Sequence, residues 1–176
     1  ERVLRLYQKL QALQAQVLEA AEDASDLDLL GRLMLRTSAR NQLHGTVMAI
    51  EAQGRNDRIQ LRLAEDLSID AQITHDSTLR LELQIGTEVV ALIKAGWLEL
   101  SAPEHSATPG DNCLRGLIEE ILDAEDGPSE VRISLPNGQT LCALAEPLHL
   151  KTQGLTADKP VQVQFSPPNV LLGTPL

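Results

Sequence analysis

The side chains in the first half of the chain that could do chemistry are hydrogen-bond donors and cations. The stretch Thr37-Ser38-Ala39-Arg40-Asn41 opens this half, Thr74 and Ser77 lie in its middle, and Lys94 ends an apolar run. Hydroxyl, guanidinium and ammonium groups hold small oxyanions, because each charge-assisted hydrogen bond contributes roughly 1.5–3 kcal/mol. About four or five such contacts, less the cost of immobilisation, reach the roughly −8 kcal/mol of micromolar binding. The pattern therefore indicates a site for a small oxyanion.

The second half of the chain repeats the first but carries different residues at these positions. Asn41-Gln42-Leu43-His44-Gly45 corresponds to Asn112-Cys113-Leu114-Arg115-Gly116, and the apolar positions that follow are repeated as well. Where the first repeat has donors and cations, the second has acids or inert groups. The residues that replace Ser38, Arg40, Thr74, Ser77 and Lys94 are Pro109, Asp111, Glu146, His149 and Ser166. The second repeat therefore lacks the donor set.

The elements that must position these residues change in type near residue 36. Residues 1–36 have a helical period, and a second short helix is expected over 27–36 with Ser25 or Asp26 as its N-cap. The apolar residues of the first helix have the spacing of a coiled-coil seam: Val3, Leu6, Leu10, Leu13, Val17 and Ala20. We interpret this segment as a dimerisation helix, because the rest of the chain has β patterns. An amphipathic helix packed on its own domain is the alternative.

From residue 37 onward the hydrophobic period is two, which predicts β-strands. Short strands are expected at 47–50, 59–63 and 89–93, with turns at Gln53-Gly54 and Ile85-Gly86. Repeats of this size, each with roughly five or six short strands, suit small barrels of the oligonucleotide/oligosaccharide-binding (OB) type. The predicted fold is mainly β with N-terminal helices. Its parts are a helical segment at 1–36, a first barrel at 37–105 and a second at 106–176, with the linker at 101–111.

Charge and composition exclude several kinds of partner. The chain has 176 residues, a net charge of −10 and only 2% aromatic residues. An acidic surface repels nucleic acids and anionic membranes, and so few aromatics leave no stacking platform for single strands. Net charge governs long-range steering, whereas affinity comes from a few donors within hydrogen-bond reach. The negative charge therefore does not exclude an anion as ligand.

Cysteine usage and the absence of apolar runs favour a cytoplasmic protein. Cys113 and Cys142 lack the paired spacing of a zinc site and are too few for a disulfide framework, so a reducing compartment is expected. No apolar run approaches the roughly 20 residues of a membrane span, and no signal-peptide pattern opens the chain. The sequence starts at Glu1, without Met, inside a helical pattern. We therefore expect a natural N-terminal part to precede it.

The sequence offers little for an enzyme. The four histidines, which are His44, His75, His105 and His149, do not have the spacing of metal ligands. No bare metal cation is therefore expected. The acidic pairs Glu119-Glu120 and Glu125-Asp126 suit a solvated face better than an acid/base dyad, which needs facing carboxylates in separate environments. No activated nucleophile or phosphate-binding loop is apparent. We predict a binding protein without catalytic activity.

Several stretches resemble the Mop, or TOBE, family of molybdate-binding domains. Thr37-Ser38-Ala39-Arg40-Asn41-Gln42, with Gly45 after it, is similar to the opening motif of these domains. Gly86-Thr87-Glu88-Val89 and Ala91-Leu92-Ile93-Lys94-Ala95 are similar to their closing strand. Tandem units after a long helix resemble the effector half of the ModE family of molybdate-responsive transcriptional regulators. Asn137-Gly138-Gln139-Thr140-Leu141-Cys142-Ala143 also resembles the second Mop unit of that family.

The resemblance implies a molybdate-sensing effector domain that binds molybdate, or tungstate as a mimic, at the interface of a homodimer. In this family the motif Ser and Arg and the Lys after the apolar strand bind the anion with nearby backbone N–H groups. A Thr and a Ser complete the site from the partner chain. The implied ligand residues are Ser38, Ala39, Arg40, Thr74, Ser77, Lys94 and Ala95. DNA would be bound only by a winged helix-turn-helix preceding Glu1.

Two alternative functions remain open from the sequence. A molybdate storage or buffering protein of tandem Mop units would bind several anions per chain and would lack the heptad helix. The regulatory tail of a molybdate-importing transporter ATPase is less favoured, because nothing resembles a nucleotide-binding segment. The number of anions bound per chain separates a sensor from a storage protein.

Overall fold

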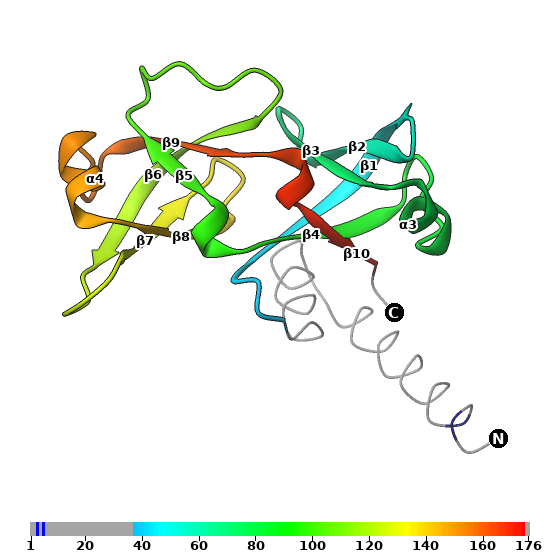
Figure 1. The fold of residues 1–176 in the computed structure, drawn as a ribbon, viewed down its shortest axis with the longest axis horizontal. Coiled ribbons are helices and arrows are strands. Elements are labelled where there is room, and N and C mark those ends of the chain that lie inside the picture. The colour runs from blue at the N-terminus through cyan, green and yellow to red at the C-terminus, as the bar shows by residue number, and fades with distance from the viewer. Residues whose placement is uncertain (1–2, 4, 6–36, 175–176) are drawn as a thin grey trace. The chain divides into compact units, whose positions relative to one another are not determined.

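The computed structural model describes residues 3, 5 and 37–174 of the chain (Figure 1). Residues 38–174 form one compact unit. The helices and the coiled-coil seam predicted over 1–36 lie outside the described residues, apart from Val3 and Arg5. Within the described part, no helix has both the length and the apolar character needed to cross a membrane.

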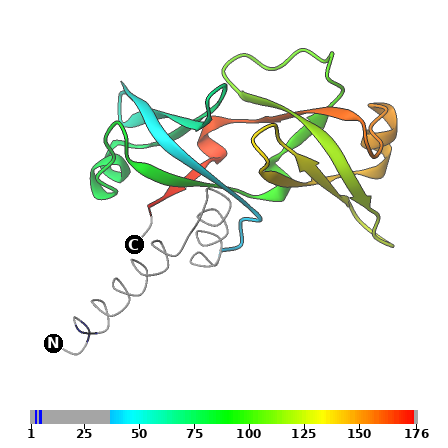
Figure 2. The same ribbon diagram turned by 180° about the vertical axis from the view of Figure 1, so that it is seen from behind.

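The unit contains two five-stranded antiparallel sheets (Figures 1 and 2). The first has the order β10-β4-β1-β2-β3 and the second the order β5-β9-β6-β7-β8. The strands are β1 (Asn41–Gln53), β2 (Asn56–Ala64), β3 (Leu67–Thr74), β4 (Glu88–Ile93), β5 (Glu99–Ser101), β6 (Asn112–Leu122), β7 (Ser129–Ser134), β8 (Thr140–Ala145), β9 (Pro160–Phe165) and β10 (Leu171–Gly173). The short helices are α3 (His75–Arg80), α4 (Pro147–Thr152) and the 3-10 helices η1 (Ala95–Trp97) and η2 (Pro167–Asn169).

Alternating apolar residues build the cores of these sheets, as the period of two predicted. On β2, Ile59 and Leu61 are fully buried, and Val131 and Ile133 are their counterparts on β7. Successive side chains of a strand point to opposite faces, so one apolar face per strand is buried and the other stays polar. Strand β1 is longer than the predicted segment 47–50, because the Asn41-to-Gly45 motif is itself part of the strand.

The last strand of each sequence repeat pairs in the sheet of the other repeat. Strand β5, which ends the first repeat, pairs with β9, and β10, which ends the second, pairs with β4. The helices η1 and η2 precede these strands and pack against β8 and β3, respectively, of the other repeat. The boundaries 37–105 and 106–176 thus describe the repeats in the sequence, whereas each sheet takes its edge strand from the other repeat. Neither sheet is complete without both repeats.

Two buried asparagines join the repeats through matching contacts. The Asn41 side chain donates to the Cys142 carbonyl oxygen (2.8 Å) and accepts from the Cys142 N–H (2.6 Å). The Asn112 side chain makes the same pair of bonds with the backbone of Asp70, at 2.8 and 2.7 Å. A primary amide that donates and accepts in this way imitates a neighbouring strand and satisfies two backbone groups. This explains why both repeats carry asparagine at this position.

The glycine of each repeated motif makes room for the neighbouring strand. A Cβ atom at Gly116 would lie 2.5 Å from Ile133 Cγ2 and 2.8 Å from the Ser134 carbonyl oxygen. At Gly45 the nearest atom would be the Arg62 carbonyl oxygen, at 3.0 Å. A backbone carbonyl in a sheet moves less readily than the end of a side chain, so the added methyl group strains the strand pair.

Replacement of these two glycines is expected to have unequal effects. Gly116→Ala should lower the free energy of unfolding by about 2–3 kcal/mol and Gly45→Ala by about 1 kcal/mol, because the clash at Gly116 is closer. Urea denaturation of the two variants measures the difference. A larger loss for Gly45→Ala would contradict the strand spacing described here.

Candidate functional site

Five of the seven predicted ligand residues lie together at one end of the first sheet. They are called the cationic half-site: Ser38, Ala39, Arg40, Lys94 and Ala95. Strands β1 and β4 pair Asn41 with Ile93, so Arg40 and Lys94 are the next residues along the two neighbouring strands. Ala39 and Ala95 are only 3% and 5% exposed. These buried alanines anchor the backbone, while the side chains of Ser38, Arg40 and Lys94 are exposed to solvent.

The Lys94 side chain is held in place by an aromatic ring. Its Nζ lies 5.1 Å from the centre of the Trp97 ring, which is within the range of a cation–π interaction. The helix η1 creates this contact, because Lys94 caps it and Trp97 ends it. The ring thus orients the ammonium group, and Trp97 is next to a predicted ligand.

The Arg40 guanidinium is paired with a carboxylate that the sequence did not indicate. Arg40 Nη1 lies 2.6 Å from Oε1 of Glu130, on β7 of the second repeat. The hydrogen bond that Arg40 donates to Glu130 is the main reason that the pKa of Arg40 is raised, and the same bond lowers the pKa of Glu130. Both groups therefore stay charged at neutral pH. Local sequence does not indicate this contact, because Glu130 is 90 positions from Arg40 in the chain.

The other two predicted ligand residues, Thr74 and Ser77, form a separate hydroxyl half-site. Thr74 is the N-cap of α3, and its Oγ1 accepts from the Ser77 N–H (3.1 Å) and lies 2.8 Å from Ser77 Oγ. The buried carboxylate of Asp57 supports the start of this helix, with its Oδ2 2.9 Å from His75 Nδ1. Hydrogen bonds from Thr78 and then from His75 lower the pKa of Asp57. Thr74 is exposed and Ser77 is half-buried on this well-anchored turn.

The two half-sites lie at opposite ends of the first sheet. The cationic half-site adjoins Asn41, where β1 begins, and Thr74 pairs with Asn56, which follows the end of β1 at Gln53. At about 3.3 Å per residue, the length of β1 separates them by roughly 35–40 Å. In Figure 1, α3 accordingly lies far from the start of β1. A single chain therefore does not bring the seven predicted residues together.

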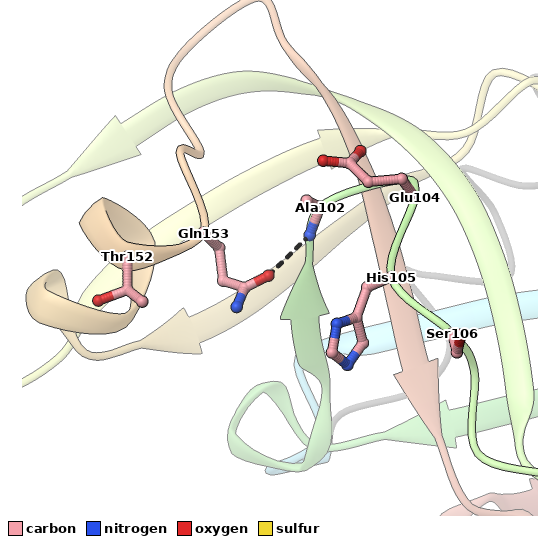
Figure 3. Close-up of a pocket in the computed structure, with 6 residues that line it drawn as sticks. All are labelled: Ala102, Glu104, His105, Ser106, Thr152 and Gln153. Carbon is pink, nitrogen blue, oxygen red and sulfur yellow. Dashed lines mark hydrogen bonds between the residues drawn. The ribbon is translucent and has the colours of Figure 1, made fainter.

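The pocket in Figure 3 has a different character from either half-site. It has a volume of about 460 Å³ and lies between the segment after β5 and the end of α4. The Ala102 N–H donates to the Gln153 side-chain oxygen (3.1 Å), and both residues line the pocket. Its lining residues are Ala102, Glu104, His105, Ser106, Thr152 and Gln153. With a carboxylate and no lysine or arginine in this lining, the pocket does not suit an anion.

The cysteines and acidic residues offer no metal centre in the described part of the chain. Cys113 is exposed, Cys142 is half-buried, and neither forms a disulfide. Among residues 3, 5 and 37–174, no group of three or more His, Cys, Asp or Glu side chains is arranged to hold a metal ion.

Comparison with known sequences shows similarity to regulators and binding proteins. The family model described as TOBE domain matches residues 37–100 and 108–172. The chain is 34% identical to the transcriptional regulator ModE of Yersinia pestis over 180 residues, which covers 99% of this chain and 68% of that protein. It is 33% identical to the DNA-binding transcriptional dual regulator ModE of Escherichia coli K12, with the same coverage. The molybdenum-pterin-binding protein MopB of Rhodobacter capsulatus is 33% identical over 149 residues, or 81% of this chain and 54% of that protein.

A solved structure has the same fold. The cytoplasmic molybdate-binding protein ModG, crystallised with molybdate bound, superposes with a TM-score of 0.76 at 27% sequence identity. The match covers 80% of this chain and 100% of the ModG chain. The prediction of a mainly β fold with two tandem small barrels is thereby confirmed. The relatives named here are regulators or binding proteins, not enzymes.

Proposed function

The chain belongs to the TOBE-domain family and to its ModE-type regulators, as its sequence motifs predicted, and on this premise we propose that it is the molybdate-sensing part of a transcriptional regulator. The ligand is molybdate, for which tungstate is a mimic. Contact with DNA would be made by a segment outside the two barrels, because the chain that forms the barrels is acidic. We further propose that the protein acts in the cytoplasm and has no catalytic role.

The observation that carries this proposal is the division of the donors between the two ends of the first sheet. The cationic half-site offers charge and the hydroxyl half-site offers two oriented hydroxyls, and neither alone surrounds a tetrahedral anion. Two chains related by a two-fold axis can place the cationic half-site of one against the hydroxyl half-site of the other. Such an isologous arrangement creates two equivalent combined sites in each dimer. We therefore propose a homodimer with two molybdate ions, one per chain.

The surface around the hydroxyl half-site supports contact with a second copy. Leu79, on α3, is 63% exposed, and Ile85, in the following loop, is 74% exposed. Exposed aliphatic side chains on an element that also carries predicted ligands suggest that another protein surface covers them. Covering the site would exclude water and strengthen the hydrogen bonds to the anion.

Binding between subunits also supplies a way to signal. An anion that joins two chains favours the arrangement in which its donors are close together, and it can shift the equilibrium only by its differential affinity for the two arrangements. The alternative, a storage protein, predicts several anions per chain. The second repeat has Asp111, Glu146 and Ser166 in place of Arg40, Thr74 and Lys94, so it lacks both cations, which favours one anion per chain.

Anion selectivity tests this proposal. Tungstate is expected to bind within about threefold of molybdate, because the two dianions have nearly the same size and charge. Sulfate is smaller, so it leaves some donors at poor hydrogen-bond distance, and it is expected to bind about 100-fold more weakly. Titration calorimetry measures affinity and stoichiometry, and Trp97 fluorescence reports occupancy because Trp97 contacts Lys94. Equal affinities for sulfate and molybdate would contradict the proposal.

A further inference from the structure

The ion pair between Arg40 and Glu130 connects a predicted ligand of the first repeat to the second repeat, which lacks a donor set of its own. Arg40 is half-exposed, with 53% of its side chain accessible, whereas Glu130 is 19% accessible. The carboxylate is thus the more fixed partner, and the guanidinium rests against it. The backbone next to Arg40 is also fixed, because Asn41 is bonded to Cys142 on β8.

This ion pair is not required to join the repeats. At the corresponding junction, Asp111 takes the place of Arg40 and accepts a hydrogen bond from Gln164 of its own repeat (3.0 Å). The asparagine contact is nevertheless the same at both junctions, through Asn112 instead of Asn41. The Arg40–Glu130 pair is therefore an added feature at the junction where the cationic half-site lies.

A carboxylate near an anion site could either compete with the ligand or orient the arginine. Guanidinium has five N–H donors in a planar fork, and the pair with Glu130 occupies Nη1, so other donors remain for a ligand. Glu130 also faces a second cation, with its Oε2 3.4 Å from Arg132 Nη2. Two guanidinium groups thus share one carboxylate, which reduces its repulsion of an approaching dianion. The geometry favours orientation over competition.

We propose that Glu130 is a positioning residue for the molybdate site, holding the Arg40 guanidinium from the second repeat so that its remaining donors face the anion. This inference rests on the proposed function. An arginine that is already fixed loses less conformational freedom when the ligand binds, which increases affinity. The second repeat, without an anion site of its own, then contributes directly to the site of the first.

The test compares Glu130→Gln and Glu130→Asp with Glu120→Gln as a matched control. Glu120 contacts Arg132 at 3.4 Å but has no ion pair with Arg40, so its loss removes a nearby charge without freeing Arg40. Molybdate affinity is expected to fall about tenfold in Glu130→Gln. Glu130→Asp should show a similar loss, since the shorter side chain keeps the charge but draws back from the guanidinium. Glu120→Gln should bind as the wild type does.

An Arg40→Ala background separates positioning from a general effect on the fold. There, adding Glu130→Gln should change the affinity no further, because the group that Glu130 positions is gone. An equal loss in both backgrounds, an unchanged affinity in Glu130→Gln, or tighter binding in that variant would overturn the inference. A wild-type chain that does not bind molybdate would instead overturn the proposed function, so the two failures are distinguishable.

Discussion

Mixing two variants that are defective in different half-sites is expected to restore molybdate binding that neither variant shows alone. Arg40→Ala removes a cation from one half-site, and the double variant Thr74→Ala, Ser77→Ala removes both hydroxyls from the other. Each variant is expected to bind at least about 100-fold more weakly, through the loss of one or two charge-assisted hydrogen bonds. Lys94→Ala should behave like Arg40→Ala.

Restoration follows from the separation of the half-sites within a chain. In a mixed dimer, one site combines the intact cationic half-site of one chain with the intact hydroxyl half-site of the other, and the second site carries both defects. With random pairing, half of the dimers are mixed and about a quarter of all sites recover wild-type affinity. Calorimetric titration of the mixture, with native mass spectrometry to count mixed dimers, measures this fraction.

The controls for this experiment use residues that do not belong to either half-site. Asp111→Asn changes the residue that replaces Arg40 in the second repeat and should leave molybdate affinity nearly unchanged. All five side chains substituted in the test variants and this control lie outside the buried apolar core, so each variant is expected to keep the fold. Circular dichroism checks this. If mixed dimers form and no high-affinity sites appear, the shared site is wrong.

A charge placed in the last part of the second repeat is expected to destabilise the first sheet, most of whose strands belong to the first repeat. Val170 is fully buried between η2, which packs against β3, and β10, which pairs with β4. Val170→Asp would bury a carboxylate without a partner, at a cost of at least about 4 kcal/mol. Since domains of this size are stable by about 5–15 kcal/mol, this loss brings the protein close to unfolding.

The matched control is the neighbouring Leu171→Asp, because Leu171 is 47% exposed and should tolerate the charge. The milder Val170→Ala keeps the protein folded and shows where the structure loosens. Hydrogen exchange in that variant should increase in β3 and β4 more than in β6 to β8. Faster exchange confined to residues 112–165 would indicate that each repeat closes its own sheet, contrary to the strand exchange.

Much of the candidate site could be predicted from local sequence. The donor types at Ser38, Arg40 and Lys94, and their contrast with the second repeat, follow from side-chain chemistry and from the internal repeat. The short helix α3 was not predicted, because six residues are too few to establish a helical period. Glu130 was missed because nothing in its own neighbourhood distinguishes it from a solvated acid on a strand.

The sequence by itself determined that the described residues fold as two related β units, which faces of the strands are buried, and which residues could hold a dianion. Only the tertiary structure decided which sheet receives β5 and β10, that Arg40 meets Glu130, and that one chain separates its cationic and hydroxyl half-sites. The physical reason is that a period of two specifies the buried face of a strand but not its neighbour. Leu98 and Leu100 match Val170 and Leu172 in pattern, so either sheet could bury either pair. The types of single residues therefore predicted oxyanion binding, whereas the assembly of the binding site depends on contacts between distant parts of the chain.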